Sequence, residues 1–181
     1  MKSYLNFESL YSNISNEQIR NTQIISYALG SGMTLFFGVT LFYYYLEYIP
    51  DPNILEETHN LFYLKYLSIL AFISLLVMSY IQPLKVLSNE LDAVKNDNIT
   101  EKDYDKFVGI HRSYLIVRLA LLEGAGLFGL VIFFMSILNY TIYSFPIYWI
   151  CTIPAIVMIL YVIILFPTKT KVSNFILENM I

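Results

Sequence analysis

Residues 143–166 have the sequence YSFPIYWICTIPAIVMILYVIILF, a run of 24 positions without a charged side chain. The hydrocarbon core of a bilayer is about 30 Å thick, and an α-helix needs about 20 apolar residues to cross it. This run therefore predicts a transmembrane helix. Within it, Pro154 removes one backbone hydrogen bond and predicts a kink, which is open to interpretation as static packing or as a hinge.

Three further runs have a similar length and apolar character, at 24–46, 61–81 and 114–138. Of the 181 residues, 57% are hydrophobic and only 14% are charged, whereas a soluble domain carries about 25% charged residues. A buried helix of a soluble protein explains one such run but not four. The sequence predicts an all-α polytopic membrane protein with four transmembrane helices.

The predicted helices divide the chain into five segments. Because residues 1–23 are polar and lack the pattern of a cleaved signal peptide, the first apolar run is expected to be a retained helix. Pro83 and Pro167 are expected to end the second and fourth helices. The predicted segments are a cytoplasmic N-terminus at 1–23, a first transmembrane hairpin at 24–82, a cytoplasmic middle loop with helical extensions at 83–113, a second transmembrane hairpin at 114–166 and a cytoplasmic tail at 167–181.

The distribution of Lys and Arg predicts the orientation. The loops 47–60 and 139–142 contain no Lys or Arg, and of the 11 basic residues in the chain only Lys65 belongs to that side. Basic residues stay in the cytoplasm, so both termini are predicted to be cytoplasmic in a multi-pass protein of the inner (plasma) membrane. Lys65 is expected to extend outward to water. Tyrosines near the span ends predict an interfacial aromatic belt: Tyr43, Tyr44, Tyr45, Tyr48, Tyr63, Tyr66, Tyr80, Tyr140, Tyr143 and Tyr148.

The chain contains an internal repeat. IISYALGSGMTLFFGVTLF at 24–42 aligns with IVRLALLEGAGLFGLVIFF at 116–134. The repeat predicts two tandem hairpins in the same orientation. Each copy has two small residues four positions apart, which permit close helix packing within one chain or between chains. These residues are Ala28 and Gly32 in the first copy, and Ala120 and Gly124 in the second.

Glu123 is an acid inside the third span. It lies about ten residues into the run, or about 14 Å deep, so it is expected to face the protein interior, to be protonated or to be paired. The equivalent residue of the first repeat is Ser31. One interpretation is a proton or ion site formed by Glu123 and Ser31. The other is a structural acid bonded to Ser31, to a tyrosine or to Arg118, although Arg118 is expected to reach the cytoplasmic headgroups more easily.

The sequence contains no complete catalytic motif. No HExxH, Gly-rich phosphate loop or nucleophile elbow is present, and the single cysteine, Cys151, excludes an intramolecular disulfide. The two histidines lie near the membrane edges, so they do not form the facing pair that a haem requires. A net charge of −3 does not favour nucleic acid. We therefore predict no catalytic residues, no metal ligands and no cofactor.

The sequence resembles two known families, one over a short stretch and one over the whole chain. ALLEGAGLFGLVIFF at 120–134 resembles the carboxylate helix of rotary ATPase proteolipids, which implies that Glu123 carries an ion; in that family, however, the acid lies on the second helix of the hairpin. The whole chain, including FPTKTKV at 166–172, resembles small uncharacterised four-helix membrane proteins of Bacteroidetes. That resemblance implies location and topology without an assigned activity.

Two functions are expected. The first is a structural or accessory membrane subunit without catalysis of its own, which forms a homo-oligomer or joins a larger membrane complex through its Gly/Ala faces. The second is ion- or proton-coupled translocation through Glu123. In both cases the partners are the lipid bilayer and other membrane subunits, and a membrane enzyme is a more distant alternative.

Overall fold

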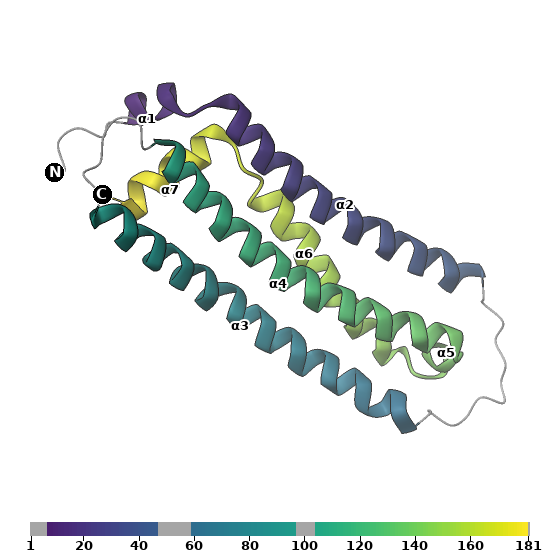
Figure 1. The fold of residues 1–181 in the computed structure, drawn as a ribbon. Helices are drawn as coiled ribbons and strands as arrows, with labels where there is room; N and C mark the ends of the chain where they lie inside the picture. Colours follow the sequence, from purple (N-terminus) through teal and green to yellow (C-terminus); the bar gives the residue numbers. More distant parts are fainter. Residues whose placement is uncertain (1–6, 47–58, 97–103, 181) are drawn as a thin grey trace.

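The computed structural model describes residues 7–46, 59–96 and 104–180, which form helices joined by short turns (Figure 1). Four stretches are long and apolar enough to cross a membrane, at 16–46, 63–92, 105–138 and 146–164. The prediction of an all-α membrane protein with four spans is confirmed. The elements are α1 (Phe7–Asn13), α2 (Asn16–Leu46), α3 (His59–Asn96), α4 (Tyr104–Leu138), α5 (Thr141–Ser144), the 3-10 helix η2 (Pro146–Thr152), α6 (Ile153–Ile164) and α7 (Lys169–Met180).

The central helix of the bundle is α4. It packs against α2, α3 and α6, whereas α2 and α3 lie on opposite sides of it and make almost no contact with each other (Figure 1). Half of the α4 span is buried, compared with 22% of the α2 span and 17% of the α3 span. The two halves of the repeat therefore pack differently, because α4 and α6 form a packed hairpin and α2 and α3 do not.

Helix α3 continues through Pro83 to Asn96, so Pro83 does not end the second helix as expected, whereas the predicted helical extension beyond it is present. A proline inside a helix loses one backbone hydrogen bond. Beyond it, Leu87 is buried and Leu91 packs against the same cluster, which also contains Phe107 and Ile110 of α4. This apolar burial offsets the lost bond, and most of the predicted middle loop is therefore helical.

One end of the bundle is closed by α1 and α7, which contact each other. Val172 and Ile176 of α7 are fully buried in the apolar cluster at this end. Pro167 lies in the turn between α6 and α7, as predicted, and its carbonyl accepts a hydrogen bond of 2.8 Å from Gln23 Nε2. These contacts fix the amphipathic α7 across the end of the bundle.

The fourth span is not one continuous helix. Its first part is the 3-10 helix η2, and Pro154 is the second residue of α6, where a proline costs no helical hydrogen bond. The expected kink or hinge in mid-helix is thus a junction between two helix types. A Cβ built on Gly129 of α4 would lie 2.2 Å from the Cys151 carbonyl oxygen and 3.4 Å from Pro154 Cγ, so glycine permits this close approach.

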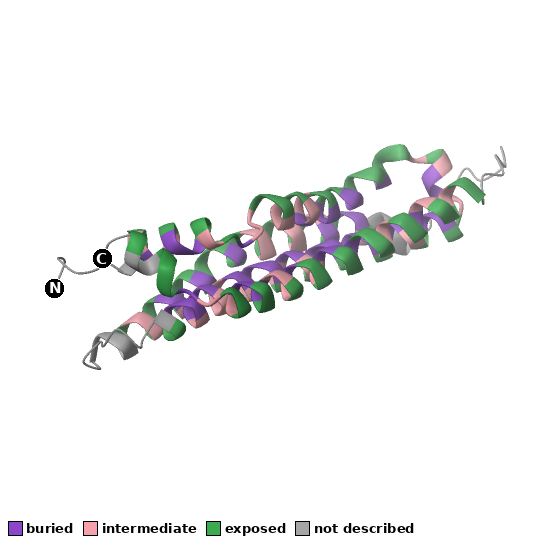
Figure 2. Ribbon diagram, turned by 90° about the horizontal axis from the view of Figure 1, so that it is seen from above, coloured by how far each residue is buried: buried purple, intermediate pink, exposed green. Residues whose placement is uncertain are grey.

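The distribution of polar and apolar side chains in the bundle is that of a membrane protein. Large apolar side chains such as Leu35, Leu70 and Ile163 are exposed on the outside, while buried residues follow the interior (Figure 2). Buried hydroxyl groups donate to backbone carbonyls of the preceding turn, as Ser26 does to Thr22 at 3.0 Å. The interior hydroxyls are therefore compatible with a water-free core.

Candidate functional site

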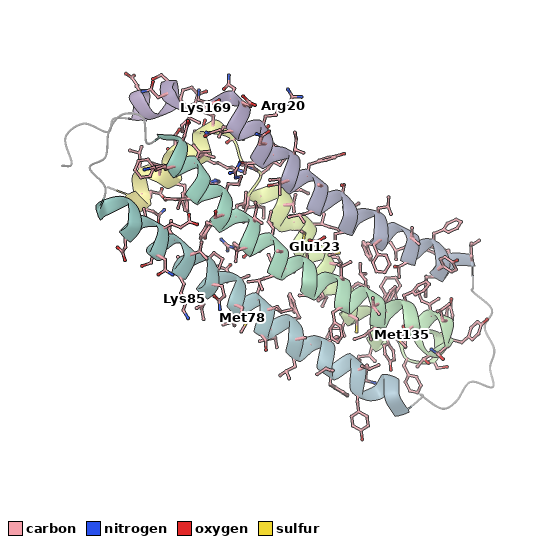
Figure 3. The ribbon with its side chains drawn as sticks, in the orientation of Figure 1. Arg20, Met78, Lys85, Glu123, Met135 and Lys169 are labelled. Carbon is pink, nitrogen blue, oxygen red and sulfur yellow. The ribbon has the colours of Figure 1, made fainter. Side chains whose placement is uncertain are left out.

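Two faces of α4 differ in what covers them. The packed face includes Arg118, Leu122, Gly126 and Gly129, which are buried at intervals of three or four residues. The open face consists of exposed residues at the same spacing, with the partly buried Glu123 among them. The exposed members of the open face are Ala120, Gly124, Leu127, Val131, Met135 and Leu138. Figure 3 shows Glu123 and Met135 along this helix.

Glu123 is not paired within the part of the chain that the structure describes. No hydrogen bond or ion pair to its carboxylate is formed there, including with Arg118, whose contacts lie elsewhere. Ser31 is exposed, and its Oγ donates to the Ala28 carbonyl at 3.0 Å. The structure therefore does not bring Glu123 and Ser31 together in one site.

Ser31 instead lines a groove of about 740 Å³ between α2 and α6. The groove is almost entirely apolar and opens to the outside of the bundle. Its other lining residues are Tyr27, Gly30, Thr34, Leu35, Ile159, Val162, Ile163 and Phe166.

The predicted small-residue pairs do not form the close crossings of this chain. Ala28 and Ala120 are exposed, and a Cβ added to Gly32 or Gly124 would meet nothing within 4 Å. The close contacts are made by other glycines. A Cβ on Gly126 would lie 2.6 Å from Met33 Cε of α2, and one on Gly30 would lie 2.9 Å from Val162 Cγ1 of α6. Packing of the predicted pairs between chains stays a prediction.

Arg118 forms an unexpected cluster on the packed face. Its side chain is only 9% exposed. Nη1 donates to the Tyr114 hydroxyl at 3.1 Å, and Nη2 donates to the Tyr161 hydroxyl at 3.4 Å. The guanidinium carbon also lies 4.4 Å from the ring centre of Tyr80 and 5.0 Å from that of Tyr161. We refer to Arg118, Tyr80, Tyr114 and Tyr161 as the Arg118 cage.

The cage brings together α3, α4 and α6. The Tyr80 and Tyr161 hydroxyls are hydrogen-bonded to each other and so connect α3 to α6 beside the guanidinium. The buried Nε of Arg118 has no hydrogen-bond partner among the described residues. The Arg118 side chain packs onto the aromatic rings of α3 and α6, a setting that the sequence did not predict. Of its partners, only Tyr114 has a sequence signal, since it lies one helical turn before Arg118.

A second polar cluster surrounds Lys65 near the opposite end. Lys65 is only 4% exposed, and its Nζ lies 5.2 Å from the ring centre of Tyr148, which is fully buried. The prediction that Lys65 extends to water is therefore wrong. Ser68 Oγ and Cys151 Sγ are 3.3 Å apart in the same region. All four side chains are enclosed, so this cluster offers no access to a substrate and we interpret it as structural.

The tyrosines predicted to form an aromatic belt have different surroundings in the structure. At the end of α2, the Tyr44 ring stacks on Tyr143 at 5.4 Å and meets Trp149 edge-on at 5.2 Å. Tyr148 and Tyr80 instead belong to the two polar clusters, and Tyr48 lies outside the described residues. These tyrosines therefore have two separate roles.

Within residues 7–46, 59–96 and 104–180, no group of three or more His, Cys, Asp and Glu side chains is placed to hold a metal ion. The candidate functional groups are thus Glu123, unpaired among the described residues, on the open face and the Arg118 cage on the packed face. Comparisons of the chain with protein-family models, with curated proteins and with solved structures give no match.

Proposed function

We propose that this chain is a non-catalytic membrane subunit that associates with a second copy of itself through the open face of α4. The observation that carries the proposal is the Glu123 carboxylate, which is only partly buried and has no partner among the described residues. The open face is otherwise apolar, and it has free space above Gly124.

A carboxyl group without a partner is costly in hydrocarbon, by several kcal/mol. A second copy supplies a partner of matching chemistry. A protonated carboxyl group has one donor and a free acceptor, so two Glu123 side chains satisfy each other across a two-fold axis. Ala120 and Gly124 on either side of Glu123 permit the close backbone approach that such a pair requires.

We further propose an inner-membrane location with the α1–α7 end in the cytoplasm. Arg20, Lys85 and Lys169 lie in the half of the bundle nearer to that end (Figure 3). In the described part of the opposite half, the basic residue is Lys65, which is buried. The positive-inside rule therefore favours cytoplasmic termini.

The test compares two substitutions of glycine by leucine. Gly124→Leu places a large side chain on the open face, whereas Gly38→Leu does so at an exposed position of α2 that also has nothing within 4 Å. Native mass spectrometry in mild detergent should show dimers for wild type and for Gly38→Leu, but monomers for Gly124→Leu. Dimers of equal abundance in all three proteins would refute association through this face.

Ion translocation through Glu123 is the second candidate. It is favoured by the same unpaired carboxylate and by the resemblance of 120–134 to proteolipid carboxylate helices. Glu123→Gln separates the two functions, because an amide still donates and accepts in a dimer but cannot carry a proton. Loss of proton flux in liposomes, and of labelling by dicyclohexylcarbodiimide, would support translocation. If wild type and Glu123→Gln form dimers equally and neither carries protons, the result supports the structural role.

A further inference from the structure

The depth of the Arg118 cage matches that of lipid headgroups. Arg118 precedes the end of α4 at Leu138 by 20 residues, which corresponds to about 30 Å, the thickness of the hydrocarbon core. Tyr161 lies three residues before the end of α6 at Ile164. If the opposite ends of these spans are at one edge of the hydrocarbon, the cage is at the other edge, on the side of α1 and α7.

The cage has more hydrogen-bond donors than acceptors. The guanidinium has five N–H donors, and each of the three phenols adds one O–H. Three hydrogen bonds join these groups: Arg118 to Tyr114, Arg118 to Tyr161, and Tyr80 with Tyr161. Within residues 7–46, 59–96 and 104–180, the buried Nε of Arg118 has no acceptor. What the cluster lacks is a group that only accepts hydrogen bonds.

The cage also has an uncompensated positive charge. No acidic side chain of the described residues forms an ion pair with Arg118. The faces of the Tyr80 and Tyr161 rings stabilise a cation, but less than a direct anionic partner does once the site is desolvated. A buried charge without a counter-ion is unfavourable by several kcal/mol. An anion would therefore gain both charge neutralisation and hydrogen bonds.

We propose that the Arg118 cage binds the phosphate group of a phospholipid from the leaflet at the α1–α7 end. Phosphate oxygens only accept hydrogen bonds, and guanidinium binds them in a bidentate fashion. Access is from the outer side of α3, since the Tyr80 side chain is 48% exposed. The hydrogen bond between Tyr80 and Tyr161 must open for phosphate to reach Nε. This site lies on the packed face of α4 and is independent of the proposed dimer.

The test measures lipid binding to the full-length protein in detergent. The probes are phosphatidylglycerol, diacylglycerol with the same acyl chains, and inorganic phosphate without lipid. Binding is followed by native mass spectrometry and by the rise in melting temperature. Arg118→Gln removes the charge at the site. Lys85→Gln is the matched control, because Lys85 is an exposed cation on α3 outside the cage (Figure 3).

Phosphatidylglycerol should bind wild type and Lys85→Gln alike and Arg118→Gln about tenfold or more weakly, the effect of losing a charge-assisted hydrogen bond. Diacylglycerol should not show this difference. If inorganic phosphate alone stabilises the protein in an Arg118-dependent manner, the anion is free phosphate rather than a lipid. Equal binding of phosphatidylglycerol and of phosphate to all three proteins would overturn the proposal.

Arg118→Lys is a second variant that keeps the test valid if Arg118→Gln does not fold. Lysine keeps the charge but loses the planar fork, so phosphatidylglycerol affinity should fall by about threefold to tenfold while the fold is retained. A purely structural Arg118 predicts a different result. The melting temperature without lipid would then fall in Arg118→Gln, while the lipid affinity of Arg118→Lys would equal that of wild type, and this outcome would refute the phosphate site.

Discussion

The packed face and the open face of α4 carry the same kinds of residue but meet different surroundings. Each has a charged side chain and small residues at helical spacing. On the packed face, Gly129 lies against the Cys151 backbone and Arg118 lies among tyrosines. On the open face, nothing lies within 4 Å above Gly124, and Glu123 has no partner in the described residues. Small residues therefore permit close packing but do not determine which face is buried.

The largest expected effect separates the glycines of the two faces. Gly129→Ala would place a methyl group 2.2 Å from the Cys151 carbonyl oxygen, and backbone cannot yield as a side-chain end does. We expect a loss of about 3 kcal/mol or more in unfolding free energy, the upper range for overpacking. Thermal unfolding in detergent, followed by circular dichroism, measures it.

The matched control is Gly124→Ala, which adds the same methyl group on the open face of the same helix. The unfolding free energy of its monomer should lie within about 0.5 kcal/mol of the wild-type value, or slightly above it because alanine favours helix. Similar losses in both variants would show that the two faces do not differ in packing as described.

A smaller effect is expected for the phenols. Tyr161→Phe removes the hydroxyl that accepts from Arg118 and bonds Tyr80, so it should cost about 1–3 kcal/mol. Tyr27→Phe is the control, because Tyr27 is 69% exposed on α2 and forms no hydrogen bond with the described residues. The same unfolding assay should show no change for Tyr27→Phe. A stable Tyr161→Phe protein would mean that the cage does not hold α4 to α6.

Much of the fold could be predicted from the sequence, because membrane spans follow from local composition. The ends of the first and third spans at Leu46 and Leu138, and the break at Pro167, were predicted from residue type alone. A helical extension of the second span was expected as well, but its unbroken passage through Pro83 was not, since this depends on Leu87 packing against residues of α4 and α7 that are distant in the chain.

The candidate sites were predictable only in part. Glu123 is conspicuous in the sequence because acids are rare in apolar runs. The Arg118 cage was missed because Tyr80 and Tyr161 come from α3 and α6, and their approach to Arg118 depends on the position of α4 between them. The contact of α4 with both helices has no local sequence signal.

Cysteine cross-linking in native membranes shows whether two copies meet at the open face of α4. Gly124→Cys is on the open face next to Glu123, and Met78→Cys is at an exposed position of α3; Glu123 and Met78 lie at a similar depth along the bundle (Figure 3). Cys151 is buried and serves as the unreactive background. A disulfide forms only when two Cα atoms come within about 7 Å. Association through the open face predicts a cross-linked dimer of Gly124→Cys and none of Met78→Cys. Failure of Gly124→Cys to cross-link, or equal cross-linking of both variants, would contradict it.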